Sequence, residues 1–259
     1  MKQAIVVVSF GVSDPITKNK CIDGVIDDIH AEFPDYDVVE AWTSRFLIKK
    51  LAAEGIYYGT LEDVLGNLAE AGYQKVVVLP THLTPGEEFN NKILSVAKAR
   101  KGSFRELKVM EPVLTGSKPA DYAGVAEILM ELDSLKEDEE LVLMGHGSPN
   151  THNPVYELIQ AYADDNNLPV HIGVVEANDY PTLEDVIRRL KAKGVRKVLL
   201  RPMMLVGGEH ATNDMAGNAP DSWKNVLLSE KIGVRCIVAG LGENKLYRSL
   251  YVNKLKNMI

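Results

Sequence analysis

The sequence predicts an α/β protein made of two similar lobes, each a four-stranded parallel sheet flanked by helices. Three observations carry this prediction: short runs rich in valine, amphipathic segments between them, and a second half that repeats the first. Short apolar runs of this kind are typical of parallel strands that are buried on both faces. At 259 residues, the chain is long enough for one large domain or for two of about 130 residues.

Eight apolar runs are spaced along the chain, four in each half. In order they are AIVVVS (4–9), VVEA (38–41), KVVVLP (75–80), LKVMEPV (107–113), LVLMG (141–145), VHIGVVEA (170–177), KVLLRPMML (197–205) and VRCIVAG (234–240). Two of the segments between them repeat their apolar side chains at helical spacing, which predicts helices there. The repeating residues are Cys21, Val25, Ile29 and Phe33 in one segment and Leu183, Val186, Ile187 and Leu190 in the other.

The two halves of the chain share an ungapped match. Residues 58–91 agree with residues 180–213 at 15 of 34 positions, and TLEDV in both supplies a threonine N-cap with an acidic residue three positions later. Further upstream the offset changes from 122 to 136 residues, which aligns Gly11 with Gly147 and Glu40 with Glu176. The change indicates an insertion in the first half near SRFLIKKLAAEGIY. We therefore predict a duplicated α/β unit.

The duplication divides the chain into an N-terminal lobe, 1–125, and a C-terminal lobe, 126–259. The last segment, ENKLYRSLYVNKLKNMI, has the pattern of an amphipathic helix. Three roles are open for it: it closes the second lobe, crosses to the first, or makes a subunit contact in a homo-oligomer.

Composition excludes several classes of function. A net charge of −7 and a pI near 5.5 argue against binding to nucleic acid or to an anionic membrane surface. The two cysteines, Cys21 and Cys236, lack the spacing of a disulfide framework or a zinc knuckle. No run approaches the ~20 apolar residues that span a bilayer, and the first residues lack a signal-peptide pattern, so we expect a cytoplasmic protein. Neither a GxGxxG nor a GxSxG motif marks a dinucleotide site or a hydrolase.

Three residues of the second half follow predicted strands and suit a metal ion. His146 lies in MGHGS, Glu176 follows IGVV, and His210 lies in VGGEH. Ligands of open parallel sheets gather beyond the carboxyl ends of the strands, so we expect these side chains to converge. Two imidazoles and a carboxylate suit Co, Fe, Ni or Zn and leave coordination positions open. Each residue alone also fits a structural role, such as a helix cap for Glu176 or a surface loop for His210.

The first half keeps a different set of residues at the matching positions. Phe10 replaces the histidine, and the loop PTHLTPGEEFN contains His82 and Glu88. If the lobes face one another, Glu88 lies near the counterpart of His210 and offers a carboxylate for proton handling. For His82, a hydrogen bond to the backbone of its loop is the simpler interpretation.

The whole chain resembles a known family through several motifs. They are VVSFGVS, MGHGS, IGVVEAND, PMMLVGGEHATNDMAG followed by DSWK, and GLGEN. This pattern resembles the class II tetrapyrrole chelatases, and most closely the anaerobic sirohydrochlorin cobaltochelatases of the CbiK type. The most specific part is the block from Met204 to Met215 together with Asp221–Lys224.

The resemblance implies two ferrochelatase-like lobes with a tetrapyrrole cleft between them. It implies insertion of Co²⁺ into sirohydrochlorin for cobalamin biosynthesis, without a nucleotide. His146 matches the family's metal-binding and proton-accepting histidine, Glu176 and His210 match its other metal ligands, and Glu88 matches an acidic residue of the cleft. Fe²⁺ or Ni²⁺ would fit the same ligands, and the alternatives are an iron chelatase for sirohaem or a metal or haem carrier without turnover.

A tetrapyrrole with several carboxylates also needs apolar contacts and hydrogen-bond donors. An apolar wall could press on the macrocycle, and backbone N–H groups and hydroxyls at the glycine loops could bind carboxylates. The residues expected to contact the substrate are Ser9, Phe10, Gly11, His82, Ser148, Met204, Leu205 and Val206.

Overall fold

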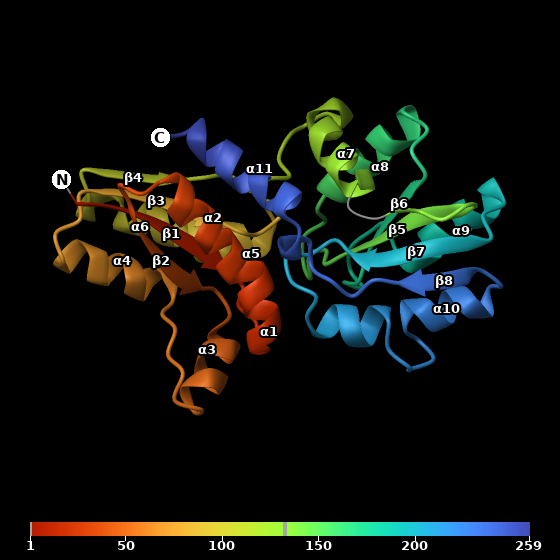
Figure 1. The fold of residues 1–259 in the computed structure, drawn as a ribbon, viewed down its shortest axis with the longest axis horizontal. Coiled ribbons are helices and arrows are strands. Elements are labelled where there is room, and N and C mark those ends of the chain that lie inside the picture. The colour runs from red at the N-terminus through yellow and green to blue at the C-terminus, as the bar shows by residue number, and fades with distance from the viewer. Residues whose placement is uncertain (1, 132–133) are drawn as a thin grey trace. The chain divides into compact units, whose positions relative to one another are not determined.

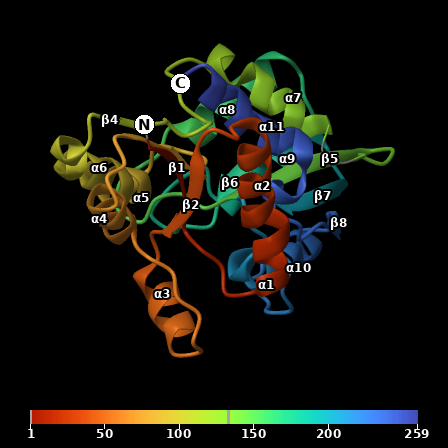
Figure 2. The same cartoon turned by 60° about the vertical axis from the view of Figure 1, so that its left-hand side comes forward.

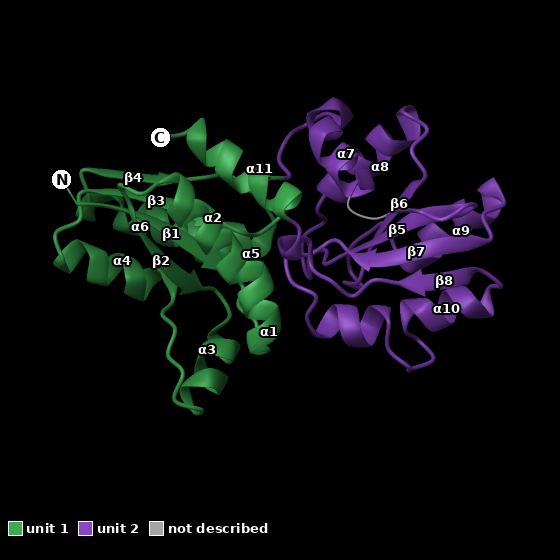
Figure 3. Cartoon of the chain, in the orientation of Figure 1, with its two compact units in different colours: residues 1–113, 245–259 green, residues 114–244 purple. Residues whose placement is uncertain are grey.

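The computed structural model describes residues 2–131 and 134–259 and divides into two compact units. Unit 1 comprises Met1–Val113 with Lys245–Ile259, and unit 2 comprises Leu114–Asn244 (Figure 3). The division follows Val113 rather than residue 125, because the segment after it packs on a helix of unit 2. The C-terminal segment is a helix and packs within unit 1.

Unit 1 contains a parallel sheet in the order β2-β1-β3-β4 (Figure 1). Its strands are β1 (Gln3–Ser9), β2 (Asp37–Trp42), β3 (Lys75–Pro80) and β4 (Glu106–Val109). Its α-helices are α1 (Pro15–Lys18), α2 (Gly24–Glu32), α3 (Arg45–Ala52), α4 (Leu61–Glu70), α5 (Glu87–Phe89), α6 (Ser95–Arg100) and α11 (Lys245–Lys256).

Unit 2 repeats this arrangement with the strand order β6-β5-β7-β8, again all parallel. Its strands are β5 (Glu139–Gly145), β6 (Val170–Val174), β7 (Lys197–Pro202) and β8 (Gly233–Cys236). Its helices are α7 (Ala123–Glu131), α8 (Val155–Asp165), α9 (Leu183–Lys193), α10 (Trp223–Ser229) and the π-helical segment η5 (His210–Met215). The equal strand orders confirm the predicted duplication and the α/β fold class.

The repeated TLEDV motif begins equivalent helices in the two units. In α4, Thr60 accepts a hydrogen bond from the backbone of Asp63, and the Asp63 carboxylate accepts one in return from the backbone of Thr60. Thr182 and Asp185 form the same reciprocal pair at the start of α9. Each pair satisfies two backbone donors that the first helical turn leaves open. The sequence signal for both helix starts is thereby confirmed.

Alternating strand residues pack against helices on both faces of each sheet. In unit 1, one core joins the strands to α4 and to the segment before α6; its strand members are Ala4, Val6, Val8, Val76 and Val78. In unit 2, the corresponding core joins β5 and β7 to α9 and α10. Burial on both faces explains why these strands are continuous apolar runs instead of alternating ones.

The C-terminal helix α11 packs beside α2 in unit 1 (Figure 2). Arg248 of α11 donates to the Asp28 carboxylate of α2 at 2.7 Å. Tyr251 is fully buried and donates to the Thr81 carbonyl oxygen at 2.9 Å. Burial raises the pKa of the Tyr251 hydroxyl, which therefore stays protonated and able to donate at every physiological pH.

An ion pair fixes the beginning of β5 to β8 in unit 2. Arg235 donates from Nε and Nη2 to the two carboxylate oxygens of Glu139, at 3.0 and 2.6 Å. This bidentate pairing lowers the pKa of Glu139 to about 2, because two charge-assisted hydrogen bonds favour the ionised carboxylate. The pair ties together two strands that β7 separates in the sheet.

Several apolar runs extend beyond the strands that they predict. The run 170–177 is a strand only to Val174, and the run 197–205 only to Pro202. β7 ends at Pro202, although the N–H of Met203 still donates to the Met144 carbonyl oxygen at 2.8 Å. The shorter strands place Glu176 in a loop and His210 at the start of η5, beyond the carboxyl ends of β6 and β7. No helix within 2–131 and 134–259 is both long and apolar enough to cross a membrane.

Candidate functional site

His146, Glu176 and His210 all lie in unit 2, at the carboxyl edge of its sheet. His146 directly follows β5, Glu176 lies two residues after β6, and His210 begins η5 after β7. Because β5 lies between β6 and β7 in the sheet, the three chain segments emerge side by side. The topology therefore brings together the residues that the sequence predicts to converge.

Backbone pairing continues past the strand ends and holds His146 beside Glu176. The N–H of Glu176 donates to the His146 carbonyl oxygen at 3.0 Å, and the N–H of Val175 donates to the Gly145 carbonyl oxygen at 3.0 Å. Gly147 has φ +83°, and a Cβ there would lie 3.1 Å from the Cβ of Glu176. Glycine thus permits both the left-handed backbone and the close approach of the two loops.

The three side chains lie close together without forming a finished coordination shell. The His146 and His210 rings are perpendicular with centroids 5.0 Å apart, and Oε1 of Glu176 lies 3.8 Å from Nδ1 of His146. No three His, Cys, Asp or Glu side chains of residues 2–131 and 134–259 already converge tightly enough to hold a metal ion. The side chains of His146, Glu176 and His210 are 45%, 30% and 44% exposed, so solvent leaves them room to rotate.

Hydrogen bonds to Nδ1 set the tautomer of both histidines. His210 Nδ1 lies 2.6 Å from the Asp214 carboxylate, one helical turn further along η5. His146 Nδ1 lies 3.1 Å from the Gly147 carbonyl oxygen, which can only accept. In the neutral imidazoles Nδ1 therefore donates and Nε2 carries the lone pair. A carboxylate or carbonyl behind a histidine is the usual partner of a metal-ligating imidazole.

A buried carboxylate, Asp179, ties the His146 loop to the Glu176 loop. The Asp179 side chain has no exposed surface and accepts hydrogen bonds from the backbone of Ser148 (2.8 Å), Asn153 (3.2 Å) and Tyr180 (2.9 Å). It also lies 2.7 Å from His152 Nδ1, whose ring stacks on Tyr180. One side chain thus fixes the segment that follows His146 against the segment that follows Glu176.

Sequence reasoning missed both supporting carboxylates. Asp214 could have been found from its i+4 spacing to His210 within EHATND. Asp179 has no such local signal, because its partners other than Tyr180 lie 26 to 31 residues earlier in the chain. The backbone N–H of Ser148 donates to Asp179, whereas the sequence predicts that donors of this loop bind substrate carboxylates.

The apolar segment expected to line the substrate site is only partly exposed. Leu205 is 7% exposed, and Met204 packs against the core of unit 2. The carbonyl oxygens of Met204 and Leu205 accept hydrogen bonds from the backbone of Leu241 and Gly242, both at 2.9 Å. Val206 remains half-buried. The backbone of this segment is therefore fixed, and Leu205 serves as core.

The equivalent edge of unit 1 carries Phe10, which is 50% exposed, where unit 2 has His146. Ser9 beside it is buried, and Gly11 adopts φ +99° with its Cα against the Trp42 ring. Glu40, which the sequence aligns with Glu176, lies further back, within β2 and opposite Val7. Lys18 pairs with the Glu40 carboxylate at 3.2 Å and the Trp42 indole donates to it at 2.6 Å. The Glu40 carboxylate is thus already paired with a positive charge and hydrogen-bonded within unit 1.

His82 and Glu88 also belong to unit 1. His82 is half-buried in the loop after β3. Glu88 lies in α5 and forms an ion pair at 3.0 Å with Lys92, one helical turn further on. These two residues and the three candidate metal ligands therefore belong to different units.

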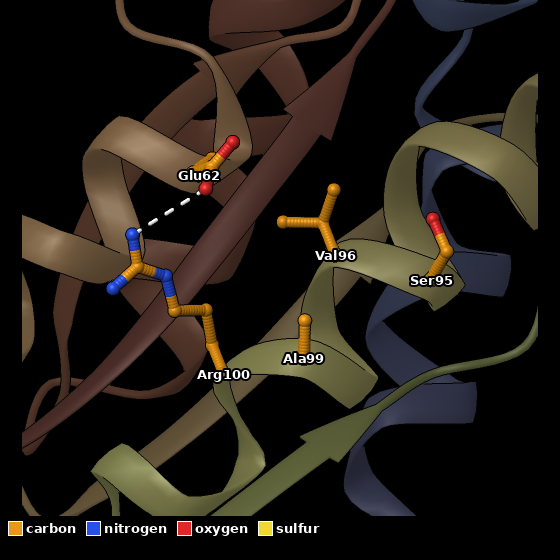
Figure 4. A pocket seen from close by; sticks show the side chains of 5 residues that line it. All are labelled: Glu62, Ser95, Val96, Ala99 and Arg100. Atoms are coloured by element: carbon orange, nitrogen blue, oxygen red, sulfur yellow. Dashed lines mark hydrogen bonds and ion pairs between the residues drawn. The ribbon is translucent and has the colours of Figure 1, made fainter.

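A hollow of about 220 Å³ lies between α4 and α6 of unit 1, and none of the residues discussed above lines it (Figure 4). It is lined by Glu62, Ser95, Val96, Ala99 and Arg100. An ion pair at 3.5 Å between Arg100 and Glu62 crosses it, with both side chains more than a third exposed. Such exposed pairs contribute little free energy, and the hollow has no cluster of chemically reactive groups.

Comparison with known proteins gives matches along the whole chain. The family model described as cobalt chelatase (CbiK) matches residues 3–259. The sirohydrochlorin cobaltochelatase of Salmonella typhimurium is 35% identical over 257 residues, covering 98% of this chain and 96% of the relative. The sirohydrochlorin cobaltochelatase CbiKC of Nitratidesulfovibrio vulgaris is 33% identical over 210 residues, covering 81% and 73%.

Among solved structures, SirB from Bacillus subtilis with Fe³⁺ aligns with a TM-score of 0.62. The alignment covers 99% of this chain and 95% of that one, at 16% sequence identity. At this level of identity the likeness concerns the fold, and it agrees with two four-stranded parallel sheets flanked by helices.

Proposed function

Because this chain belongs to the CbiK cobalt chelatase family, we propose that it inserts Co²⁺ into sirohydrochlorin without a nucleotide, as a step of cobalamin biosynthesis. The names of the two curated relatives support this substrate and metal. The single structural observation that carries the proposal is the gathering of His146, Glu176 and His210 at one sheet edge. Their nitrogen and oxygen donors suit a borderline divalent cation.

In the proposed reaction Co²⁺ is a substrate that the three side chains strip of part of its water. Nε2 of His146 and of His210 would each supply a lone pair, and Glu176 would supply a negative charge. Rotation of these partly exposed side chains would bring the donors to one ion. Three protein ligands leave coordination positions open, so the pyrrole nitrogens of the macrocycle can take over the metal one by one.

Metal insertion also releases two protons from the pyrrole N–H groups of the macrocycle. A neutral imidazole is a common general base, and we assign one of these protons to Nε2 of His146, which becomes free to accept it once the metal has passed to the pyrrole nitrogens. The Asp214 carboxylate would accept a hydrogen bond from Nδ1 of His210 and so hold the His210 imidazole in place while the metal is bound. Glu88 is a second proposed acceptor, and its ion pair with Lys92 must loosen before it takes up a proton.

Turnover tests the proposed function. Anaerobic mixing of sirohydrochlorin and Co²⁺ with a catalytic amount of protein should convert the absorption spectrum to that of the cobalt complex, with many product molecules per protein molecule and no ATP. Conversion that stops at one equivalent would identify a carrier and contradict the proposal.

The same assay decides the metal. The donor set also accepts Fe²⁺ and Ni²⁺, and SirB from Bacillus subtilis has been solved with Fe³⁺. We expect Co²⁺ to give the highest kcat/KM when Co²⁺, Fe²⁺ and Ni²⁺ are compared at equal free concentration. A higher value with Fe²⁺ would assign the protein to iron insertion instead.

A further inference from the structure

Unit 1 carries an arm, residues 45–57, that is much longer than the equivalent segment of unit 2. The arm occupies the position where the offset between the halves changes by 14 residues, and it contains α3. In both views of the molecule α3 stands away from the sheet of unit 1 (Figures 1 and 2). The proposed role of the metal ligands does not use this insertion.

The base of the arm is held firmly at the carboxyl edge of unit 1. The backbone N–H of Trp42 donates to the Gly59 carbonyl oxygen at 2.9 Å, so the chain returns to the residue from which it departs. The Tyr58 ring stacks on the Trp42 ring with centroids 3.8 Å apart. The N–H of Ser44 donates to the Phe10 carbonyl oxygen at 3.2 Å, so the arm begins beside Phe10.

The outer surface of the arm combines aromatic rings with positive charge. Phe46 is 75% exposed and Tyr57 is 79% exposed. Lys49 and Lys50 lie three and four residues after Phe46, on the same exposed face of α3, and Arg45 precedes it. The chain as a whole has a net charge of −7, so the positive charge of this segment has the opposite sign. The inward residue of α3 is Leu51, which is 5% exposed.

We propose that the arm binds the tetrapyrrole substrate, with Phe46 against the macrocycle and Lys49 and Lys50 paired with its peripheral carboxylates. This inference rests on the proposed function, which supplies the chemical class of the ligand. A flat macrocycle offers a π face to an aromatic ring, and charge-assisted hydrogen bonds form between ammonium groups and carboxylates. Exposed Phe10 at the base of the arm extends the same apolar surface.

Charge complementarity favours this occupant over a second copy of the chain. Two arms packed face to face about a twofold axis would bury Lys49 and Lys50 of both copies in one interface, and charged residues are depleted at the cores of protein interfaces. A polyanionic macrocycle instead neutralises these charges. It also has the extended apolar face that an exposed phenylalanine can cover.

The test compares two double variants of equal charge change. Lys49→Glu/Lys50→Glu reverses the charge of the arm, and Lys98→Glu/Lys101→Glu reverses two exposed lysines of unit 1 outside it. The affinity for metal-free sirohydrochlorin is measured by fluorescence titration of the full-length protein. We expect the arm variant to bind about tenfold more weakly at low salt and the control to change by less than about twofold, since distant exposed charges are screened.

A second variant separates the apolar contact from the charges. Phe46→Ser should weaken binding of metal-free sirohydrochlorin but keep the salt dependence of the wild type. Lys49→Glu/Lys50→Glu should lose most of that salt dependence. Unchanged affinity in both arm variants would overturn the proposal. So would a wild-type dimer in sedimentation that Phe46→Ser converts to a monomer, because the arm would then be a subunit contact.

The binding measurement separates this proposal from the proposed function. Wild-type protein that binds sirohydrochlorin through the arm but does not turn over Co²⁺ would contradict only the chelatase assignment. Protein that turns over, with arm variants that keep the wild-type affinity and KM, would contradict only the role of the arm. Wild-type protein that does not bind sirohydrochlorin would overturn both.

Discussion

Alanine in place of His146 should lower kcat for cobalt insertion by about 10³-fold, because the substitution removes both a metal ligand and a proton acceptor, and general-base groups alone contribute about 10²- to 10⁴-fold. The His146 side chain is 45% exposed, so its loss removes little packing. The urea midpoint of unfolding should therefore stay that of the wild type. Steady-state rates with saturating Co²⁺ and sirohydrochlorin provide the measurement.

His30→Ala is the matched control for this prediction. His30 is an exposed histidine of α2 in unit 1, and its loss should leave kcat unchanged. If His146→Ala kept most of the wild-type kcat, the histidine would be neither the ligand nor the base that we assign.

Asp179→Ala should destabilise the protein by about 3 kcal/mol, which is the usual scale when buried donors lose a charged acceptor. The substitution leaves the backbone N–H groups of Ser148 and Tyr180, and the ring of His152, without their buried carboxylate. The loops of His146 and Glu176 would then lose their common anchor. We therefore also expect weaker Co²⁺ binding, although all three ligands are retained. Urea unfolding and a Co²⁺ titration measure the two effects.

Asp165→Ala serves as the control, because Asp165 is an exposed carboxylate at the end of α8 in the same unit. Its removal should change the free energy of unfolding by less than about 0.5 kcal/mol. Equal urea midpoints for Asp179→Ala and the wild type would show that the carboxylate does not anchor the loops.

The fold follows from the sequence because its signals are local and repeated. The threonine at the start of TLEDV and the aspartate three residues later make the same reciprocal hydrogen bonds in α4 and α9. The valine-rich runs become parallel strands since two layers of helices cover them. The alignment of Glu40 with Glu176 does not hold in the structure: Glu40 lies within β2, opposite Val7, whereas Glu176 lies two residues after β6. The residue whose N–H donates to the Phe10 carbonyl oxygen, as that of Glu176 does to His146, is Ser44.

The grouping of the candidate ligands was predictable for a topological reason. His146, Glu176 and His210 each follow a strand of one parallel sheet, and the carboxyl ends of such strands share an edge. The residues that support them were not predictable in the same way. Asp179 acts through contacts with residues far earlier in the chain, and only the folded loop reveals that its side chain is buried.

The sequence pattern also did not predict where the strands end or which apolar residues are exposed. Met204 and Leu205 continue an apolar run, yet the chain leaves the sheet after Pro202 and uses Leu205 as core. Phe46 lies within an amphipathic helix, where an aromatic residue is normally expected to face inward. The structure instead exposes it, because Leu51 takes the inward position of this short helix.

The most direct measurement of the central claim is the position of cobalt in crystals grown with Co²⁺, located by anomalous scattering at the cobalt edge. We predict one ion bound in unit 2 by Nε2 of His146, a carboxylate oxygen of Glu176 and Nε2 of His210, each at about 2.0–2.2 Å. A fully occupied cobalt ion elsewhere, with these three side chains unchanged, would contradict the account.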